Sequence, residues 1–236
     1  MNRFFAVFIM MLSPSFLFSQ SLLGAWESNF IASDGIEYKN VVIFSDGFQV
    51  ATEYNKKTGA FKRTNGGSWS LNENTVTEGV EFHSENSNLV GTTVSFEIEL
   101  SENELRIVGL ESIWKRIDHG TPGNLAGAWF MSERMRDGKL QSRDTHKPRK
   151  TMKILSGTRF QWIAYNTETK QFMATGGGTY TTVNGKYTEN IEFFSRDSSR
   201  VGASLDFNYS LEDGAWHHSG LSSKGKPIYE VWSLRE

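Results

Sequence analysis

The strongest constraint on the fold is that the sequence contains the same unit twice. The motif Leu-Leu-Gly-Ala-Trp at 22–26 recurs as Leu-Ala-Gly-Ala-Trp at 125–129, an offset of 103 residues. Further along the offset is 111, and 17 of the 47 positions from 54 to 100 are identical to their counterparts. A repeat of this length is far too long for a solenoid, so it predicts two tandem domains. We expect a first repeat over 20–118, a linker over 119–124 and a second repeat over 125–236.

Residues 1–19 have the pattern of a secretory signal peptide. Arg3 supplies a positive charge, an apolar run extends from Phe4 to Leu12, and the small Ser19 before Gln20 offers a cleavage point. The apolar run is short for a membrane span of about 20 residues, so we do not expect a membrane-spanning protein. Because the chain has no cysteine, it also lacks the acceptor for an N-terminal lipid anchor. The sequence therefore predicts a secreted or periplasmic protein.

Both repeats have the pattern of antiparallel β-structure. Turn dipeptides separate short runs rich in aromatic and β-branched residues, and apolar residues alternate in runs such as 94–100 and 205–211. About eight strands fit into each repeat, enough for a sheet to close on itself and remove its edges. We expect an all-β protein of two up-and-down barrels. The turn dipeptides are Asp34-Gly35, Asp46-Gly47, Asn65-Gly66, Asp137-Gly138, Asn184-Gly185 and Asp213-Gly214.

Composition excludes several classes of function. The net charge of −2 gives no basic surplus with which to neutralise phosphates, so we expect no nucleic-acid partner. The absence of cysteine excludes disulfides, thiolate zinc sites and thiol nucleophiles. The five histidines are scattered, and the adjacent His217 and His218 diverge on a strand, so we expect no metal and no cofactor. Neither a Gly-x-Ser-x-Gly elbow nor a His-Glu-x-x-His motif occurs, which favours a protein that is not an enzyme.

The repeated motifs resemble those of lipocalins and the wider calycin group. Each repeat has Gly-x-Trp on its first strand and a late strand that carries Trp and then Arg, and the resemblance covers nearly all the chain after residue 19. The chain is also similar to lipocalin-like membrane or secreted proteins of uncharacterised function from Bacteroidetes-type bacteria. In lipocalins the tryptophan plugs the closed end of the barrel, and the arginine lies across its ring. The matching positions here are Gly24, Trp26, Arg116, Gly127, Trp129 and Arg235.

The chain departs from secreted lipocalins in ways that affect the expected function. Its repeats are shorter, and no segment predicts the usual C-terminal helix. Each barrel could therefore be narrow and filled by its own aromatic side chains. In that case the duplicated residues would form the core and hold no ligand.

Two carboxylates are candidates for the barrel interiors. Glu78 and Glu81 lie three apart on a strand and so point to opposite faces, as do Glu189 and Glu192 in the second repeat. The neighbouring apolar residues place Glu78 and Glu189 on the inner face. A buried carboxylate needs a partner and has a raised pKa. Three roles stay open for it: a structural hydrogen bond, contact with a ligand, or catalysis.

Four amphipathic aromatic residues recur at matched positions. Tyr54 and Trp69 in the first repeat correspond to Tyr165 and Tyr180 in the second. Such side chains combine apolar area with a polar group that can orient a ligand, so we include them as candidate pocket residues. Ordinary packing in the core is the alternative.

Two further segments have structural interpretations. The run 176–178 of three glycines has no Gly-Lys-Ser/Thr ending and no following helix, so it predicts a β-bulge or a barrel corner and not a phosphate loop. The basic segment 134–153 lies where the second repeat is longer than the first. It fits either a solvated hairpin or a portal flap that favours anionic ligands.

These observations lead to two hypotheses of different classes. The first is an exported, non-enzymatic protein whose barrels hold a small apolar or amphipathic ligand. The second is a structural or interaction module with filled barrels that recognises glycans or partner proteins at the cell envelope. A packed interior in both repeats would favour the second, and the sequence leaves the oligomeric state open.

Overall fold

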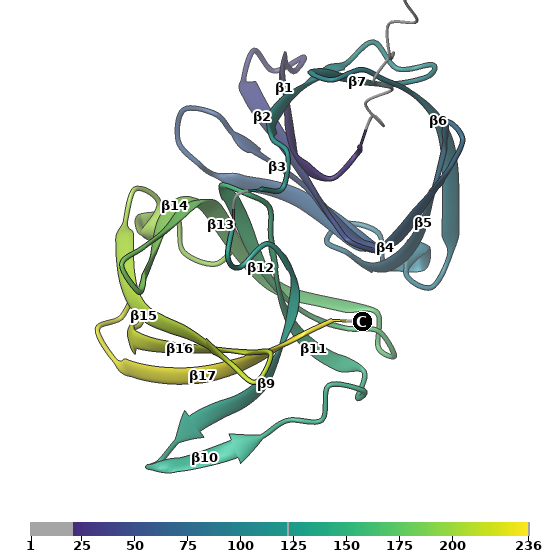
Figure 1. Ribbon diagram of the computed structural model, residues 1–236. Coiled ribbons are helices and arrows are strands. Elements are labelled where there is room, and N and C mark those ends of the chain that lie inside the picture. Colours follow the sequence, from purple (N-terminus) through teal and green to yellow (C-terminus); the bar gives the residue numbers. More distant parts are fainter. Residues whose placement is uncertain (1–20, 122, 236) are drawn as a thin grey trace, which may run out of the picture.

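The first repeat forms eight antiparallel strands that close into a barrel, here called barrel 1 (Figure 1). The computed structural model describes residues 21–121 and 123–235, so the predicted signal peptide lies outside the described residues. Each strand pairs with the next along the chain, and β1 pairs with β8 to close the ring. The strands are β1 (Gly24–Ile31), β2 (Glu37–Ser45), β3 (Phe48–Asn55), β4 (Phe61–Asn72), β5 (Thr75–His83), β6 (Thr93–Leu100), β7 (Glu104–Ile107) and β8 (Ile113–Asp118).

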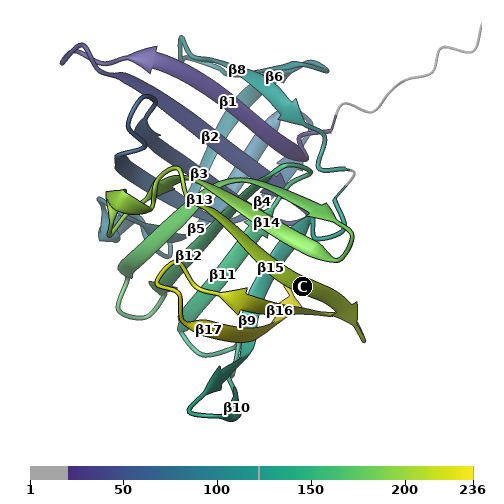
Figure 2. The same ribbon diagram turned by 90° about the vertical axis from the view of Figure 1, so that its left-hand side faces the viewer.

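The second repeat forms a second barrel of the same design, barrel 2. It is closed by pairing of β9 with β17, and β10 pairs only with β9 in a hairpin that extends beyond the barrel (Figure 2). The all-β, two-barrel fold predicted from the sequence is confirmed. The strands are β9 (Gly127–Arg136), β10 (Lys139–Ser142), β11 (Arg149–Leu155), β12 (Arg159–Asn166), β13 (Gln171–Val183), β14 (Lys186–Phe194), β15 (Ser204–Glu212), β16 (Ala215–Leu221) and β17 (Pro227–Leu234).

Among the described residues, the one helical feature in each barrel is a single 3₁₀ turn, which follows the equivalent strand in both repeats. Turn η1 (Ser87–Leu89) follows β5, and η2 (Ser198–Arg200) follows β14. The side chains of Asn86 and Asp197 cap these turns by accepting a hydrogen bond from a backbone N–H two residues on.

Turn dipeptides join several strands as the sequence predicts. At Asp137-Gly138, Asn184-Gly185 and Asp213-Gly214 both residues have positive φ, as a two-residue hairpin requires. The assignment of Asn65-Gly66 to a turn is wrong, because both residues lie inside β4. The pairing of β4 with β5 shifts register between Gly66 and Gly67, so these glycines form a bulge.

The triple-glycine run 176–178 forms the matching bulge in barrel 2, as predicted. The register of β13 against β14 shifts between Gly177 and Gly178. A Cβ on Gly178 would lie 2.0 Å from the carbonyl oxygen of Asn190, so the close approach of the strands excludes a side chain there. Bulges at equivalent places bend both barrels in the same way.

The two barrels pack against each other through their outer faces, and a shared hydrophobic core lies between them. The strands β3 and β4 face β12 and β13 across this interface (Figures 1 and 2). The core draws equally on both repeats, and most of its members are related by the offset of the duplication. Its buried residues are Ala25, Val41, Ile43, Val50, Tyr54 and Phe82 from barrel 1, and Ala128, Met152, Ile154, Ile163, Tyr165 and Phe193 from barrel 2.

Polar contacts across the interface repeat with near two-fold symmetry. The Tyr54 hydroxyl donates to Glu192 at 2.6 Å, and the matched Tyr165 hydroxyl donates to Glu81 at 2.7 Å. Each carboxylate also pairs with an arginine of barrel 2: Arg159 bonds both oxygens of Glu192 at 2.8 Å within barrel 2, and Arg235 pairs with Glu81 across the interface. The reciprocal tyrosine–carboxylate pairs resemble the contacts of a symmetric dimer interface within one chain.

The tryptophan on the first strand of each barrel lies buried at one end. The indole N–H of Trp26 donates to the Leu22 carbonyl at 3.0 Å, and that of Trp129 donates to Leu125 at 2.9 Å. Gly24 has φ +112°, and a Cβ there would lie 2.1 Å from the carbonyl oxygen of Asp118, so β1 and the end of β8 meet only because glycine is present.

The arginines of the two closing strands lie in different places. The Arg116 guanidinium lies over the Trp26 ring at 3.9 Å from its centroid. The expectation that Arg235 stacks on Trp129 is wrong, because its guanidinium lies over Phe48 at 3.7 Å and pairs with Glu81 of barrel 1. At the interface the guanidinium of Arg235 contacts the carboxylate of Glu81 and the rings of Phe48 and Phe130, so this arginine connects the two barrels.

Candidate functional site

Barrel 1 contains a cavity of about 180 Å³. It lies inside the ring of strands that Figure 1 shows nearly end-on. Its walls come from β2 to β8, and they are apolar except for Asn65 and Glu78. The other lining residues are Leu22, Val42, Phe44, Ala51, Val76, Phe96, Ile98, Leu105, Ile107 and Trp114.

Glu78 lies in this cavity without a partner. Its strand β5 places Val76 and Glu78 on the face that lines the cavity, whereas Glu81 reaches the interface between the barrels. Among the described residues none forms an ion pair or a side-chain hydrogen bond with the Glu78 carboxyl group. Burial in these apolar surroundings raises the pKa of Glu78 to about 7. An isolated, half-buried carboxyl group with a raised pKa in an apolar cavity is a frequent mark of a functional site.

A second polar group in the cavity is also unpaired. The indole Nε1 of Trp114 is buried and has no hydrogen-bond partner in the described chain. The walls of the cavity therefore include one carboxyl group without an ion-pair partner and one indole whose buried N–H has no acceptor among the described residues, an unfavourable state for a donor.

The raised pKa of Glu78 predicts how the variant Glu78→Gln changes stability with pH. The folded protein favours the protonated carboxyl group, so the contribution of Glu78 to stability is present below pH 4.5, its ordinary pKa, and is lost as the pH rises through about 7. Glu78→Gln removes this loss. It should raise the free energy of unfolding by on the order of 2 kcal/mol at pH 8 and change it little at pH 4. Urea denaturation at both pH values measures this, and a difference independent of pH would contradict it.

Barrel 2 has larger side chains at five of the positions that line the cavity of barrel 1. The offset of 111 and the pairing of equivalent strands in the same register relate each pair of positions. These side chains occupy part of the interior of barrel 2, where the tryptophans at 216 and 232 are almost fully buried. They leave a hollow of about 260 Å³, whose lining includes the polar Lys153, Glu189, His218 and Glu230. The pairs are Val42 and Lys153, Ala51 and Trp162, Val76 and Tyr187, Leu105 and Trp216, and Ile107 and His218.

The centre of barrel 2 is occupied by the ammonium group of Lys153. Its Nζ lies 2.7 Å from Oε1 of Glu189, and both side chains are less than a tenth exposed. Four rings surround the ammonium at 4.9 to 6.0 Å from their centroids, a cation–π arrangement that we call the aromatic cage. The cage consists of Tyr187, Phe207, Trp216 and Trp232.

More charged groups lie next to this cage. His218 and Glu230 contact each other at 3.5 Å, and burial together with the nearby Lys153 lowers the pKa of His218. Towards the outside, a basic groove is lined by arginines and a lysine. Its charged members are Arg134, Arg149, Arg196, Arg200, Lys224 and Asp197. Arg134 and Arg149 come from the basic segment 134–153, which forms the β9–β10 hairpin and the start of β11.

The structure divides the candidate aromatic residues into two groups. The placement of Tyr54 and Tyr165 inside the barrels is wrong, because both lie in the core between the barrels. Trp69 and Tyr180 belong to the interior clusters of their barrels. Their polar groups bond backbone carbonyls, from Trp69 to Ser45 at 2.8 Å and from Tyr180 to Ser156 at 2.6 Å. Of the six candidates, Glu78 and Glu189 therefore line hollows and the other four have structural contacts.

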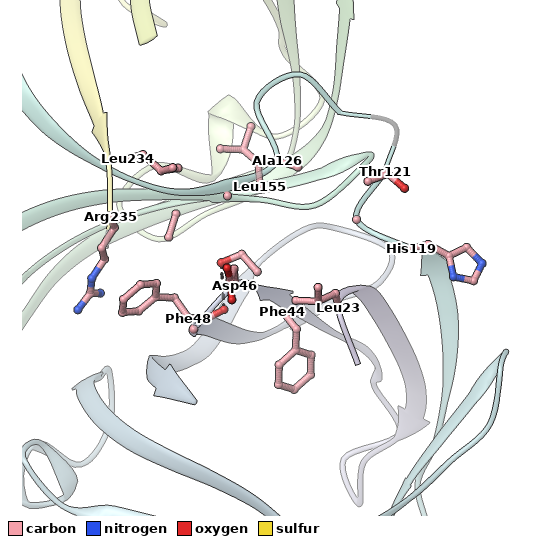
Figure 3. A pocket seen from close by; sticks show the side chains of 15 residues that line it. Leu23, Phe44, Asp46, Phe48, His119, Thr121, Ala126, Leu155, Leu234 and Arg235 are labelled. Carbon is pink, nitrogen blue, oxygen red and sulfur yellow. Dashed lines mark hydrogen bonds between the residues drawn. The ribbon is translucent and has the colours of Figure 1, made fainter. Parts of the chain in front are cut away.

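A second hollow of about 420 Å³ lies between the barrels beside the linker (Figure 3). Leu23 and Phe48 lie across it from Leu155 and Leu234, and the side chains of Phe44, His119 and Arg235 point away from its centre. This hollow lies where the rounded outer faces of the two barrels meet. The carboxyl group that lines it, Asp46, is exposed, whereas Glu78 in the cavity of barrel 1 is half-buried among apolar side chains.

The fold and its cavity define the class of protein: an all-β protein of two antiparallel eight-stranded barrels, consistent with a lipocalin-like fold. Residues 124–234, which include all the strands of barrel 2, match a protein family described as "Domain of unknown function (DUF4488)". The comparison with curated proteins found no match. Within residues 21–121 and 123–235 no helix has the length and hydropathy needed to cross a bilayer.

Proposed function

We propose that the protein is a non-enzymatic binding protein in which barrel 1 holds a small, largely apolar ligand. The observation that carries this proposal is the difference between the two interiors: the cavity of barrel 1 is lined almost entirely by apolar side chains around Glu78, whereas the hollow of barrel 2 is lined by several charged groups of its own. Engineered apolar cavities of about 150 Å³ bind molecules of the size of benzene, so a cavity of this volume suits a ligand of similar size. The signal-peptide pattern adds the proposal that binding takes place outside the cytoplasm.

The alternative of an interaction module fits barrel 2 better than barrel 1. The charged groups that line the hollow of barrel 2 are already paired within the chain, Lys153 with Glu189 and His218 with Glu230, so we assign barrel 2 a supporting role. It buries the outer face of barrel 1 through the shared core and thereby stabilises the binding repeat.

The variant Ala51→Trp tests this function, because it places in barrel 1 the residue that fills barrel 2. The full-length protein should bind n-hexanol at one saturable site, detected by saturation-transfer NMR. Ala51→Trp should weaken this binding at least tenfold, since the ring occupies the volume of the ligand. Ala60→Trp, at an exposed position, is the matched control and should bind as the parent does. Absence of saturable binding by the parent, or equal binding by Ala51→Trp, would reject the proposal.

A further inference from the structure

Barrel 2 contains a group that barrel 1 lacks, namely a cation beside its interior carboxylate. The Lys153 ammonium group on β11 reaches Glu189 on β14 through the barrel interior and lies in the aromatic cage. The matched carboxyl group in barrel 1 is Glu78, and the position of the lysine is taken by Val42. The strand pairing is equivalent in both repeats, because Val42 lies opposite Trp26 and Lys153 lies opposite Trp129. Barrel 1 therefore has the carboxyl group of the pair, Glu78, but an uncharged side chain, Val42, at the position of the lysine.

Barrel 1 also keeps part of the surroundings of that cation. Phe96 and Trp114 occupy the positions of the cage residues Phe207 and Trp232 and line the cavity. The other two cage positions hold the smaller Val76 and Leu105, and this exchange creates space beside the carboxyl group. The cavity thus combines a carboxyl group and two aromatic rings with open volume where barrel 2 has its own side chains.

We propose that the cavity of barrel 1 binds a primary amine on a short alkyl or aryl chain, with Glu78 as the counter-ion of its ammonium group. The ligand takes the place that the Lys153 side chain has in barrel 2, and this proposal rests on the ligand-binding function proposed above. The aliphatic or aromatic part of the ligand lies against Val42, Ala51 and Leu105, where it excludes water from the ion pair.

The charges around the cavity favour a cation over an anion. Glu78 is the one titratable side chain among the described residues that line it. The arginine of the closing strand, Arg116, does not line the cavity: it lies over the Trp26 ring and donates hydrogen bonds to the backbone carbonyls of Ser21 and Leu23. A carboxylate ligand would meet a buried carboxyl group and no cation, which is unfavourable. An alcohol would gain the apolar contacts without the ion pair.

Amine binding should depend on pH in a specific way. A primary alkylamine stays protonated up to about pH 10, as a lysine does. Glu78 ionises as the pH rises through about 7. Affinity for the amine should therefore increase from pH 5.5 to pH 8, whereas affinity for an alcohol of the same length should not.

The experiment compares three probes of equal chain length: n-hexylamine, n-hexanol and hexanoate. Isothermal titration of the full-length protein at pH 8 should show one site per chain, with hexylamine at least tenfold tighter than hexanol and no binding of hexanoate. Glu78→Gln should reduce the preference for hexylamine over hexanol at least tenfold and remove its pH dependence. Glu97→Gln, an exposed glutamate on the neighbouring strand β6, is the matched control and should keep the preference.

A second variant builds the internal cation into barrel 1. Val42→Lys copies the pair of barrel 2, so it should abolish hexylamine binding and increase the thermal stability at pH 8 relative to Val42→Met, which has similar length and no charge. This readout keeps the proposal testable whether or not the Glu78 variant folds.

The outcomes separate the two proposals. Binding of hexanol and hexylamine with equal affinity, unchanged by Glu78→Gln, would overturn the amine assignment and leave barrel 1 as an apolar binding site. Tighter binding of hexanoate would overturn it in favour of an anionic ligand. Failure of all three probes to bind would reject the binding function itself.

Discussion

Replacing Glu189 with Gln should lower the free energy of unfolding by about 3–5 kcal/mol, because it leaves the Lys153 ammonium group buried without its carboxylate. The two groups lie 2.7 Å apart with side-chain exposures of 6% and 7%, so water is a poor substitute for the carboxylate of Glu189. The cage rings stabilise the cation, but their cation–π contribution of about 2 kcal/mol is smaller than the loss. Urea denaturation at pH 7, followed by tryptophan fluorescence, measures the change.

Two comparisons isolate the cause of this effect. Glu78→Gln, the same substitution at the matched position of barrel 1, should not destabilise the protein at pH 7, since Glu78 has no cation to lose. The double variant Lys153→Met with Glu189→Gln should recover most of the stability, because removal of both partners leaves neither charge of this pair buried without the other. Equal destabilisation by both single glutamate variants would mean that the cost arises from packing and not from the unpaired Lys153.

Replacing Phe193 with Ala should also lower the free energy of unfolding by about 3–5 kcal/mol, through the interface between the barrels. Phe193 is 2% exposed, its ring stacks on Tyr54 at 4.9 Å, and Gly177 beneath it has no side chain with which to fill the space left by truncation. The lost contacts join the two barrels, so the variant should also unfold in two steps where the parent unfolds in one.

Differential scanning calorimetry of the full-length protein measures both the loss of stability and the number of transitions. Phe82→Ala, at the position related by the duplication, should behave alike because Phe82 packs on Tyr165 at the same distance of 4.9 Å. Phe30→Ala, at an exposed position on β1, should cost less than about 1 kcal/mol. A single transition in both interface variants would show that the barrels are coupled by other contacts.

Local signals in the sequence predicted much of the fold. The turn dipeptides at 137–138, 184–185 and 213–214 correspond to hairpins because residues that tolerate positive φ are needed there and few others supply it. The same reasoning failed at Asn65-Gly66, where glycine serves a bulge inside β4. Glycine occurs both in hairpin turns and in β-bulges, and only the lengths of the strands on either side distinguish the two structures.

Alternation along the strands correctly separated the glutamates into two sets but could not assign Tyr54 and Tyr165. In a single barrel one face of the sheet is buried and the other is exposed. Here the outer faces of both barrels are buried against each other, so an apolar residue that alternates with polar ones can lie on either side. Comparison of the two repeats contained one further signal. Val42 in the first repeat corresponds to Lys153 in the second, whereas the glutamate at positions 78 and 189 is the same in both.

The sequence by itself therefore determined the duplication, the β-structure and most of the turns, because these depend on local patterns and on identity between the copies. Only the tertiary structure decided which of the matched residues are equivalent in role. Closure of each sheet sets strands distant in the chain across a common interior, and this brings Lys153 to Glu189 in one barrel and leaves Glu78 alone in the other. The free-energy cost of a buried charge depends on whether it has a partner. The closed barrel, and not the order of residues along the chain, decides which group that partner is.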